Sequence, residues 1–223
     1  MEGVAEGCRI AGCALLGGET AEHPGMLEPD ELDMAGFCVG LCERREMVSG
    51  ARVQEGDTIV GLPASGPHSN GFSLVRALLE RAGVGLADTP QGLGGQSAAD
   101  ALLEPTRIYA AAVAELTRTV DVRAMAHITG GGIPGNLCRQ FPAGLGARID
   151  LSSWERPAVF GWLGSLGVEE EELRRVFNLG LGFAAVVAEQ DAGPALRALE
   201  RGGCAGWAAG RVTAGEGVEL AAA

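Results

Sequence analysis

Apolar positions along this chain of 223 residues change their spacing several times, from the period of a helix to that of a strand. From residue 47 onward, short apolar runs alternate with stretches in which apolar residues recur every three or four positions. The predicted strands cover residues 58–63, 123–128, 146–151, 183–188 and 207–212, and the predicted helices cover residues 71–82, 106–119, 134–140, 157–166 and 191–201. This order predicts an α+β (mixed α/β) domain in which helices cover a sheet.

The first 46 residues contain less regular structure. Their pattern predicts a helix over 4–11 and strands over 12–16 and 34–42. Two strands and one helix cannot close a core of their own. We therefore expect residues 1–46 to be the C-terminal remnant of a preceding domain and residues 47–223 to form the C-terminal domain. Within that domain, the glycine-rich residues 83–100 lack any period and predict a mobile excursion.

Composition narrows the class of protein. The net charge is −12, and no lysine- or arginine-rich run occurs, which argues against nucleic acid or an anionic membrane as partner. The chain has no basic signal-like start and no apolar stretch of membrane-spanning length, so we expect a soluble, cytoplasmic protein. Six cysteines without a C-x-x-C pair predict reduced thiols rather than a zinc site.

The strongest candidate site is the segment 65–76, which joins a predicted strand to a predicted helix. Glycine and proline let the backbone bend close to a ligand, and the free N–H groups of a helix start favour an anion. His68, Ser69 and Asn70 lie in succession there. His68 either transfers a proton or contacts a developing anion, or else it holds the loop as a structural residue; the polar neighbours favour the functional role.

The segment 17–25 follows a predicted strand end and offers two carboxylates, a hydroxyl and a glycine pair. This combination suits Mg-nucleotide binding or substrate positioning. By composition alone, a solvated acidic turn is the favoured alternative.

The segment 127–134 again joins an apolar run to a helix start, with three successive glycines. It predicts either a phosphate-cradling loop or a plain strand-to-helix turn. His127, just before the glycines, fits a hydrogen-bonded interior histidine.

The segment 177–183 places an amide among glycines just before an apolar run. Asn178 either points at a ligand or caps its own turn.

Taken in order, the segments 17–25, 65–76, 127–132 and 177–182 resemble the phosphoribosylformylglycinamidine cyclo-ligase family, also called aminoimidazole ribonucleotide synthetases. The most specific part is Ser65-Gly66-Pro67-His68-Ser69-Asn70-Gly71 with the following Ser73-Leu74-Val75-Arg76; Phe183 stands where the family usually has methionine. The resemblance implies an N-terminal domain whose strands help to form a homodimer and whose glycine loop and aspartates serve Mg-ATP. Most of that domain lies outside this chain, so we expect the chain to be inactive without it.

The resemblance also implies an activity in de novo purine biosynthesis. Formylglycinamidine ribonucleotide and ATP would be converted to aminoimidazole ribonucleotide, ADP and phosphate. His68 would be the catalytic residue, and Gly18, Glu19 and Thr20 would contact Mg-ATP, with Glu19 as the metal ligand. The implied substrate-binding residues are Ser65, Ser69, Asn70, Gly71, Thr129, Gly130, Gly131, Gly132 and Asn178.

Two other interpretations remain open. One is another ATP-using member of the same superfamily, such as a selenophosphate synthetase or a thiamine phosphate kinase. The other is a non-catalytic module that binds substrate or pairs with another chain.

Overall fold

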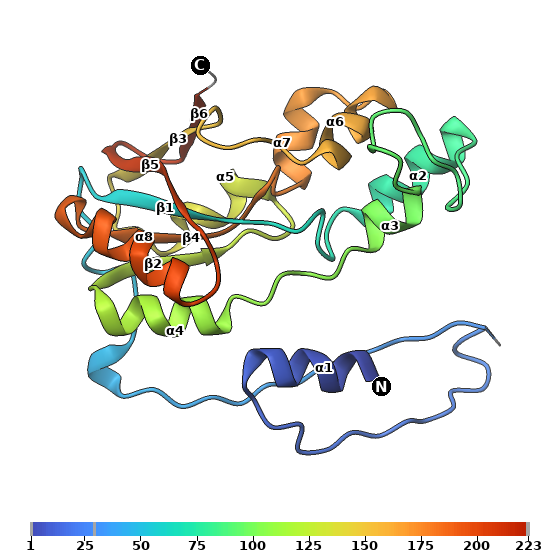
Figure 1. Ribbon diagram of the computed structural model, residues 1–223, viewed down its shortest axis with the longest axis horizontal. Helices are drawn as coiled ribbons and strands as arrows, with labels where there is room; N and C mark the ends of the chain where they lie inside the picture. Colours follow the sequence, from blue (N-terminus) through green and yellow to red (C-terminus); the bar gives the residue numbers. More distant parts are fainter. Residues whose placement is uncertain (1, 29, 222–223) are drawn as a thin grey trace. The chain divides into compact units, whose positions relative to one another are not determined.

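The computed structural model describes residues 2–28 and 30–221. The chain divides into two compact units, Met1–Met47 and Val48–Ala223, which are described separately (Figure 1). Among the described residues, no helix is both long enough and apolar enough to cross a membrane.

The first unit contains little regular structure beyond one helix. Helix α1 spans Glu2–Ala11, a single 3-10 turn, η1, spans Arg44–Glu46, and an isolated bridge joins Pro24 to Leu27. The strands predicted over 12–16 and 34–42 are wrong, because neither segment is a strand among the described residues. A strand forms only when its backbone groups find a partner. These segments have none here, and their apolar side chains are exposed, with Phe37 at 95% and Leu41 at 100%.

The second unit is built on one six-stranded sheet with the order β2-β4-β1-β5-β3-β6. Its strands are β1 (Thr58–Pro63), β2 (Val122–His127), β3 (Leu145–Asp150), β4 (Leu181–Val187), β5 (Trp207–Ala214) and β6 (Val218–Ala221). Neighbours pair antiparallel except β3 and β6, which are parallel. The sheet is therefore mixed, and the predicted α+β fold class is confirmed.

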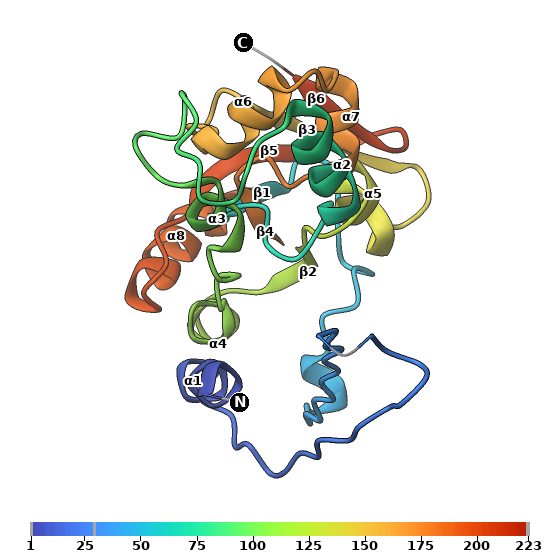
Figure 2. The ribbon, with the colours of Figure 1, turned by 90° about the vertical axis from the view of Figure 1, so that its right-hand side faces the viewer.

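Helices cover both faces of this sheet and extend beyond one end. Figure 2 shows α8 on one side of the sheet and α5 on the other, while α2, α3, α6 and α7 gather at the right of Figure 1. The helices are α2 (Phe72–Ala82), α3 (Ala98–Leu103), α4 (Ala110–Thr119), α5 (Gly132–Asn136), α6 (Ala158–Ser165), α7 (Glu170–Val176) and α8 (Ala192–Arg201), with 3-10 turns η2 (Leu137–Gln140) and η3 (Glu189–Asp191).

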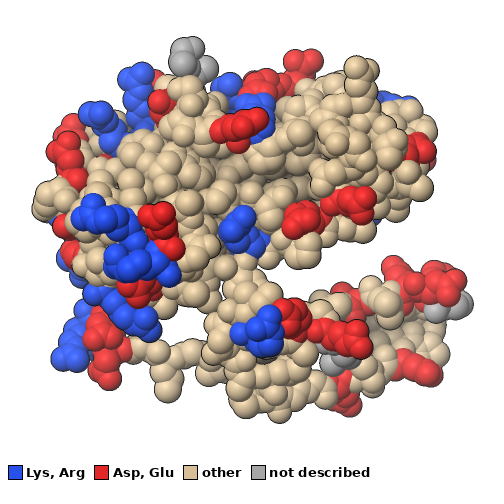
Figure 3. Space-filling view, in the orientation of Figure 1, with Lys and Arg blue, Asp and Glu red and all other residues tan. Residues whose placement is uncertain are grey.

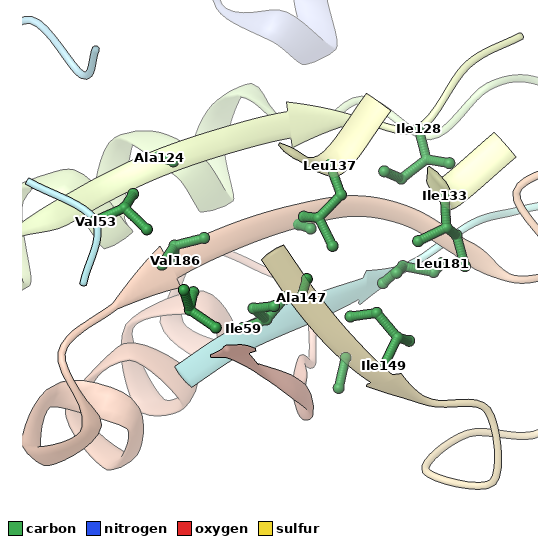
Figure 4. Packing of buried hydrophobic residues seen from close by; sticks show 13 residues of the cluster. Val53, Ile59, Ala124, Ile128, Ile133, Leu137, Ala147, Ile149, Leu181 and Val186 are labelled. Atoms are coloured by element: carbon green, nitrogen blue, oxygen red, sulfur yellow. The ribbon is translucent and has the colours of Figure 1, made fainter. Parts of the chain in front are cut away.

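The core follows from the alternation of side chains along the strands. Ile59 points to a cluster with Ile133 and Leu137 from α5 and η2, which Figure 4 shows at close range. Its neighbour Val60 points to the opposite face, where Leu116 of α4 and the apolar side of α8 cover it. A third cluster, around Phe160 and Phe177, joins α2, α3, α6 and α7.

Three elements of the second unit escaped the sequence pattern, namely α3, α7 and β6. The stretch 83–100, predicted as a mobile excursion, contains a buried side chain, Leu93, and ends in the start of α3. Ser97 caps that helix by accepting a hydrogen bond from the Asp100 N–H. The helix predicted from 106 begins only at Ala110.

Charged side chains are interspersed on the surface rather than sorted by sign, as the face in Figure 3 shows. Several form pairs that join elements distant in sequence. Arg201 of α8 lies 3.0 Å from Glu115 of α4, and Arg52 lies 2.7 Å from Asp121. Such exposed pairs contribute little to stability, on the order of 1 kcal/mol or less each.

Candidate functional site

The loops that contain the predicted site residues converge because of the sheet topology. Strand β4 is antiparallel to both β1 and β2, so the ends of β1 and β2 meet the beginning of β4 at one edge. Backbone hydrogen bonds seal this edge: the Ala64 N–H donates to the Gly180 carbonyl, and the Ile128 N–H donates to the Gly182 carbonyl. The segments 65–71, 129–132 and 177–180 therefore leave the sheet side by side.

The first loop ends at Gly71, which begins α2. Gly71 has a φ of 77°, in the left-handed region, and a Cβ there would overlap the ring of Phe177. Glycine is therefore required both by conformation and by space. It provides no side-chain cap, so the first-turn N–H groups of this 11-residue helix keep their capacity to bind an anion.

Asn70 connects the first loop to the glycine loop. Its Oδ1 accepts a hydrogen bond of 3.0 Å from the Gly130 N–H. The glycine loop is itself shaped by Asn136, whose Nδ2 donates to the carbonyls of Thr129, Gly130 and Gly132. The structure thus joins the two predicted substrate loops through one polar side chain.

Asn178 braces the third loop from inside the protein. Its side chain is 2% exposed, its Nδ2 donates to the Gly66 carbonyl at 3.0 Å, and its Oδ1 accepts from the Gly180 N–H at 2.8 Å. These bonds fit the capping role that the sequence left open. Asn178 holds the first loop to the third.

His68 lies at the centre of a ring cluster. It is 3% exposed and has a φ of 58°, and its Nε2 accepts a hydrogen bond of 3.2 Å from the Ser65 N–H. The rings of Tyr109 and His127 lie 6.4 and 6.0 Å away between centroids, and Phe183 packs on Tyr109. Burial, followed by the nearby His127 and Arg107, lowers the pKa of His68 to about 4, so its imidazole is neutral at pH 7.

A family model decides what kind of domain carries this site. The model described as "AIR synthase related protein, C-terminal domain" matches residues 54–222. The chain belongs to this family. The match covers the second unit almost entirely, including all three loops at the sheet edge.

Individual relatives agree with that assignment, and the resemblance to cyclo-ligases is confirmed. A phosphoribosylformylglycinamidine cyclo-ligase of Synechococcus sp. (strain RCC307) is 48% identical over 221 residues, which are 98% of this chain and 64% of that protein. One of Anaeromyxobacter dehalogenans (strain 2CP-1 / ATCC BAA-258) is 52% identical over 217 residues, 96% of this chain and 62% of that protein. The chain therefore spans under two thirds of the length of these relatives.

A solved structure supports the fold alone. The crystal structure of thiamine-monophosphate kinase from Stenotrophomonas maltophilia K279a matches with a TM-score of 0.53 and 18% identity, covering 80% of this chain and 54% of that chain. At this identity, the likeness says that the AIR synthase related domain and the kinase share an architecture.

Some residues of this domain's site were missed by the sequence reasoning. Asn136, Tyr109 and Gly182 reach the sheet edge only through tertiary packing, and a Cβ at Gly182 would overlap Tyr109 Oη. The available signal was Gly182 inside the apolar run of β4, because a glycine within a strand often marks a place where another part of the protein approaches the backbone closely. His127 was predicted as an interior histidine, and this is wrong, because its side chain is exposed at the end of β2.

The hydroxyl-bearing candidates differ in how they are used. Ser65 Oγ donates to the Pro105 carbonyl at 2.6 Å, and Thr129 Oγ1 donates to Asn136 Oδ1 at 3.2 Å. Ser69 is exposed beside them. Ser65 and Thr129 therefore shape their loops, whereas Ser69 is accessible to a ligand.

The residues predicted for Mg-ATP belong to the first unit. Gly18, Glu19 and Thr20 are exposed in an irregular segment, so their role stays a prediction. Within residues 2–28 and 30–221, no group of three or more His, Cys, Asp or Glu side chains is placed to hold a metal ion. Mg²⁺ bound with a nucleotide needs only one or two carboxylates, because phosphates and water complete its shell. A single Glu19 is compatible with that arrangement.

A hollow of about 430 Å³ lies elsewhere, over β3, β5 and β6. Arg148, Asp150, Ser152 and Arg211 contribute its polar lining, and the rest is alanine and glycine. None of the predicted site residues lines it. The site at the loop edge is thus defined by its polar contacts and not by the size of a cavity.

Proposed function

We propose that this chain provides the substrate-binding part of an ATP-dependent cyclo-ligase that closes formylglycinamidine ribonucleotide to aminoimidazole ribonucleotide, a cytoplasmic step of purine biosynthesis. The observation that carries the proposal is the hydrogen bond from the Gly130 N–H to Asn70, which couples two glycine-bearing loops at one sheet edge. Relatives of about 50% identity bear the name of this cyclo-ligase.

The phosphate of the ribonucleotide binds at the start of α2 in this proposal. The first-turn N–H groups lack a side-chain cap, and the helix dipole adds about half a positive charge there. Ser69 and the backbone of Gly130 and Gly131 lie on adjoining loops and bind the remaining polar groups. Such a site compensates locally for the net charge of −12.

The reaction makes the formyl amide oxygen a leaving group. ATP transfers its γ-phosphoryl group to that oxygen, which releases ADP; the amidine nitrogen then attacks the same carbon, and phosphate departs with the oxygen. Chemistry of this kind is accelerated mainly by positioning and by stabilising developing charge. The loops of the second unit position the substrate, and Gly18, Glu19 and Thr20 contribute to the Mg-ATP side, with Glu19 as metal ligand.

The enzyme acts as a homodimer in this proposal. The first unit exposes apolar side chains at Leu32, Met34, Phe37, Val39 and Leu41 along one segment. Exposed apolar surface of this kind marks interaction sites. Sedimentation equilibrium tests the proposal: we expect a dimer that Phe37→Asp and Leu41→Asp convert to monomer, and a monomeric parent chain contradicts it.

Substrate binding is tested by calorimetry with formylglycinamidine ribonucleotide. We expect Asn70→Ala to weaken binding at least tenfold, because it frees the Gly130 loop from the first loop. Gln190→Ala, an exposed amide in η3, is the matched control and should leave affinity unchanged. Equal affinity of the Asn70 and Gln190 variants contradicts the assigned site.

Catalysis is tested by ATP-dependent phosphate release. We expect no turnover from this chain alone, and turnover when it is joined to the N-terminal part of a cyclo-ligase relative. Turnover by the chain alone contradicts the dependence. Phosphorylation without ring closure favours a kinase of the same superfamily, and absence of binding favours a non-catalytic module.

A further inference from the structure

The hydrogen bond to His68 fixes where its proton resides. Nε2 accepts from the Ser65 N–H, so Nε2 must be unprotonated. The neutral imidazole therefore bears its proton on Nδ1. Adding a second proton at Nε2 would set one N–H against another, which breaks the bond and strains the loop.

Nδ1 is buried and has no hydrogen-bond partner among the described residues. A buried donor left without an acceptor loses its bonds to water and gains nothing in return, so its retention needs an explanation. We infer that His68 donates a hydrogen bond from Nδ1 of a neutral imidazole to a substrate oxygen atom, and that it does not transfer a proton. This inference rests on the proposed function and assigns the role of His68 within it.

A neutral donor suits an oxygen that gains negative charge during reaction. With Nε2 occupied and Nδ1 protonated, His68 offers no free lone pair to act as a base. A preorganised donor instead stabilises the developing charge. In the proposed substrates, the oxygens that gain negative charge during the reaction are the formyl oxygen and the phosphoryl oxygens.

The surrounding residues hold the ring in place. Tyr109 Oη donates to the Pro63 carbonyl at 2.9 Å, which commits its hydroxyl and leaves its ring against His68. A Cβ at Gly182 would lie 2.9 Å from His68 Cε1 and would overlap Tyr109 Oη. Tyr109 and Gly182 are thus positioning residues for His68.

Charged and titratable neighbours also lower the pKa of His68. His127 at the end of β2 and Arg107, before α4, both disfavour a charged His68, in addition to its burial. Nδ1 is covered, so an acceptor reaches it only when a neighbouring side chain shifts. His127 is one of these neighbours: its ring lies 6.0 Å from that of His68 between centroids, and the residue is exposed at the end of β2.

The tautomer is testable without any substrate. Long-range ¹H–¹⁵N NMR spectra of the whole chain at pH 7 should show His68 with a protonated Nδ1 and an unprotonated Nε2, and this state should persist to pH 5. A protonated Nε2, or a charged ring at pH 6, overturns the inference whether or not the chain binds a ribonucleotide.

The role of the donor is tested by two replacements of different geometry. Asn places an amide N–H near the position of Nδ1, whereas Gln places one near Nε2. In calorimetry with formylglycinamidine ribonucleotide, we expect H68N to bind within about threefold of the parent chain and H68Q to lose at least tenfold. Equal losses in both variants, with both folded by circular dichroism, overturn the Nδ1 assignment. Failure of the parent chain to bind contradicts the proposed function instead, and leaves the tautomer result standing.

H68N also separates hydrogen-bond donation from proton transfer when it is made in the active enzyme, in which this chain is joined to the N-terminal part of a cyclo-ligase relative. A donor role predicts that H68N keeps most of kcat with an unchanged pH profile between pH 6 and 8. Loss of kcat in H68N to the level of H68A, with loss of an ionisation from the profile, assigns proton transfer and overturns the inference.

Discussion

The segment 34–42 and strand β1 have similar apolar patterns, but only β1 forms a strand. Strand β1 lies between β4 and β5, and its central residues are buried. The segment 34–42 is unpaired among the described residues, and Phe37 and Leu41 are almost wholly exposed. An apolar pattern therefore gives a strand its propensity, but a hydrogen-bonding partner decides whether the strand forms.

The largest expected effect compares two phenylalanines. Phe177 is fully buried against Phe160, so Phe177→Ala should lower the free energy of unfolding by about 3–5 kcal/mol. Phe37→Ala should change it by less than about 0.5 kcal/mol, because Phe37 is exposed. Urea unfolding followed by far-ultraviolet circular dichroism, which reports on the helices of both units, measures both. Similar losses in the two variants would show that the first unit also buries a core.

The next effect is a loss of folding stability at low pH that is caused by protonation of His68. His68 has a pKa of about 4 in the folded chain and about 6.5 when unfolded, so the unfolded chain binds the proton more tightly. The stability that results is complete above pH 6.5 and is lost as the pH falls toward 4, by up to about 3 kcal/mol. Urea unfolding at several pH values should show this loss in the parent chain and not in H68N.

The control for this comparison is His23→Gln, because His23 is exposed in the first unit. That variant should reproduce the pH dependence of the parent chain. If H68N also reproduces it, His68 is not held neutral by its surroundings.

A smaller effect is expected at Asn178. Asn178→Ala removes the bonds to Gly66 and Gly180 and leaves both backbone groups buried without a partner, at a cost of about 2–3 kcal/mol. Met26→Ala, at an exposed position of the first unit, should be neutral. Thermal unfolding measures the two, and a neutral Asn178→Ala would mean that the third loop is not braced by its amide.

Elements of the second unit with a clear local pattern were predicted well from the sequence, whereas α3, α7 and β6 were missed. Strand β1 was placed at its observed residues, and α2 within one residue of them. The polar run His68 to Asn70 identified the first loop, and three glycines identified the second. The amide of Asn136, the hydroxyl of Tyr109 and the space at Gly182 could not be found this way, because each matters only through a residue brought near by folding.

The central claim is that the segments 65–71 and 129–132 bind one ligand together. Backbone ¹H–¹⁵N spectra recorded during titration with formylglycinamidine ribonucleotide test it most directly. We expect the amides of Ser69, Gly71 and Gly130 to shift along one common binding curve, while those of Arg148 and Arg211, which line the distant hollow, stay in place. Shifts at the hollow with none at the two loops would contradict the assignment of this site.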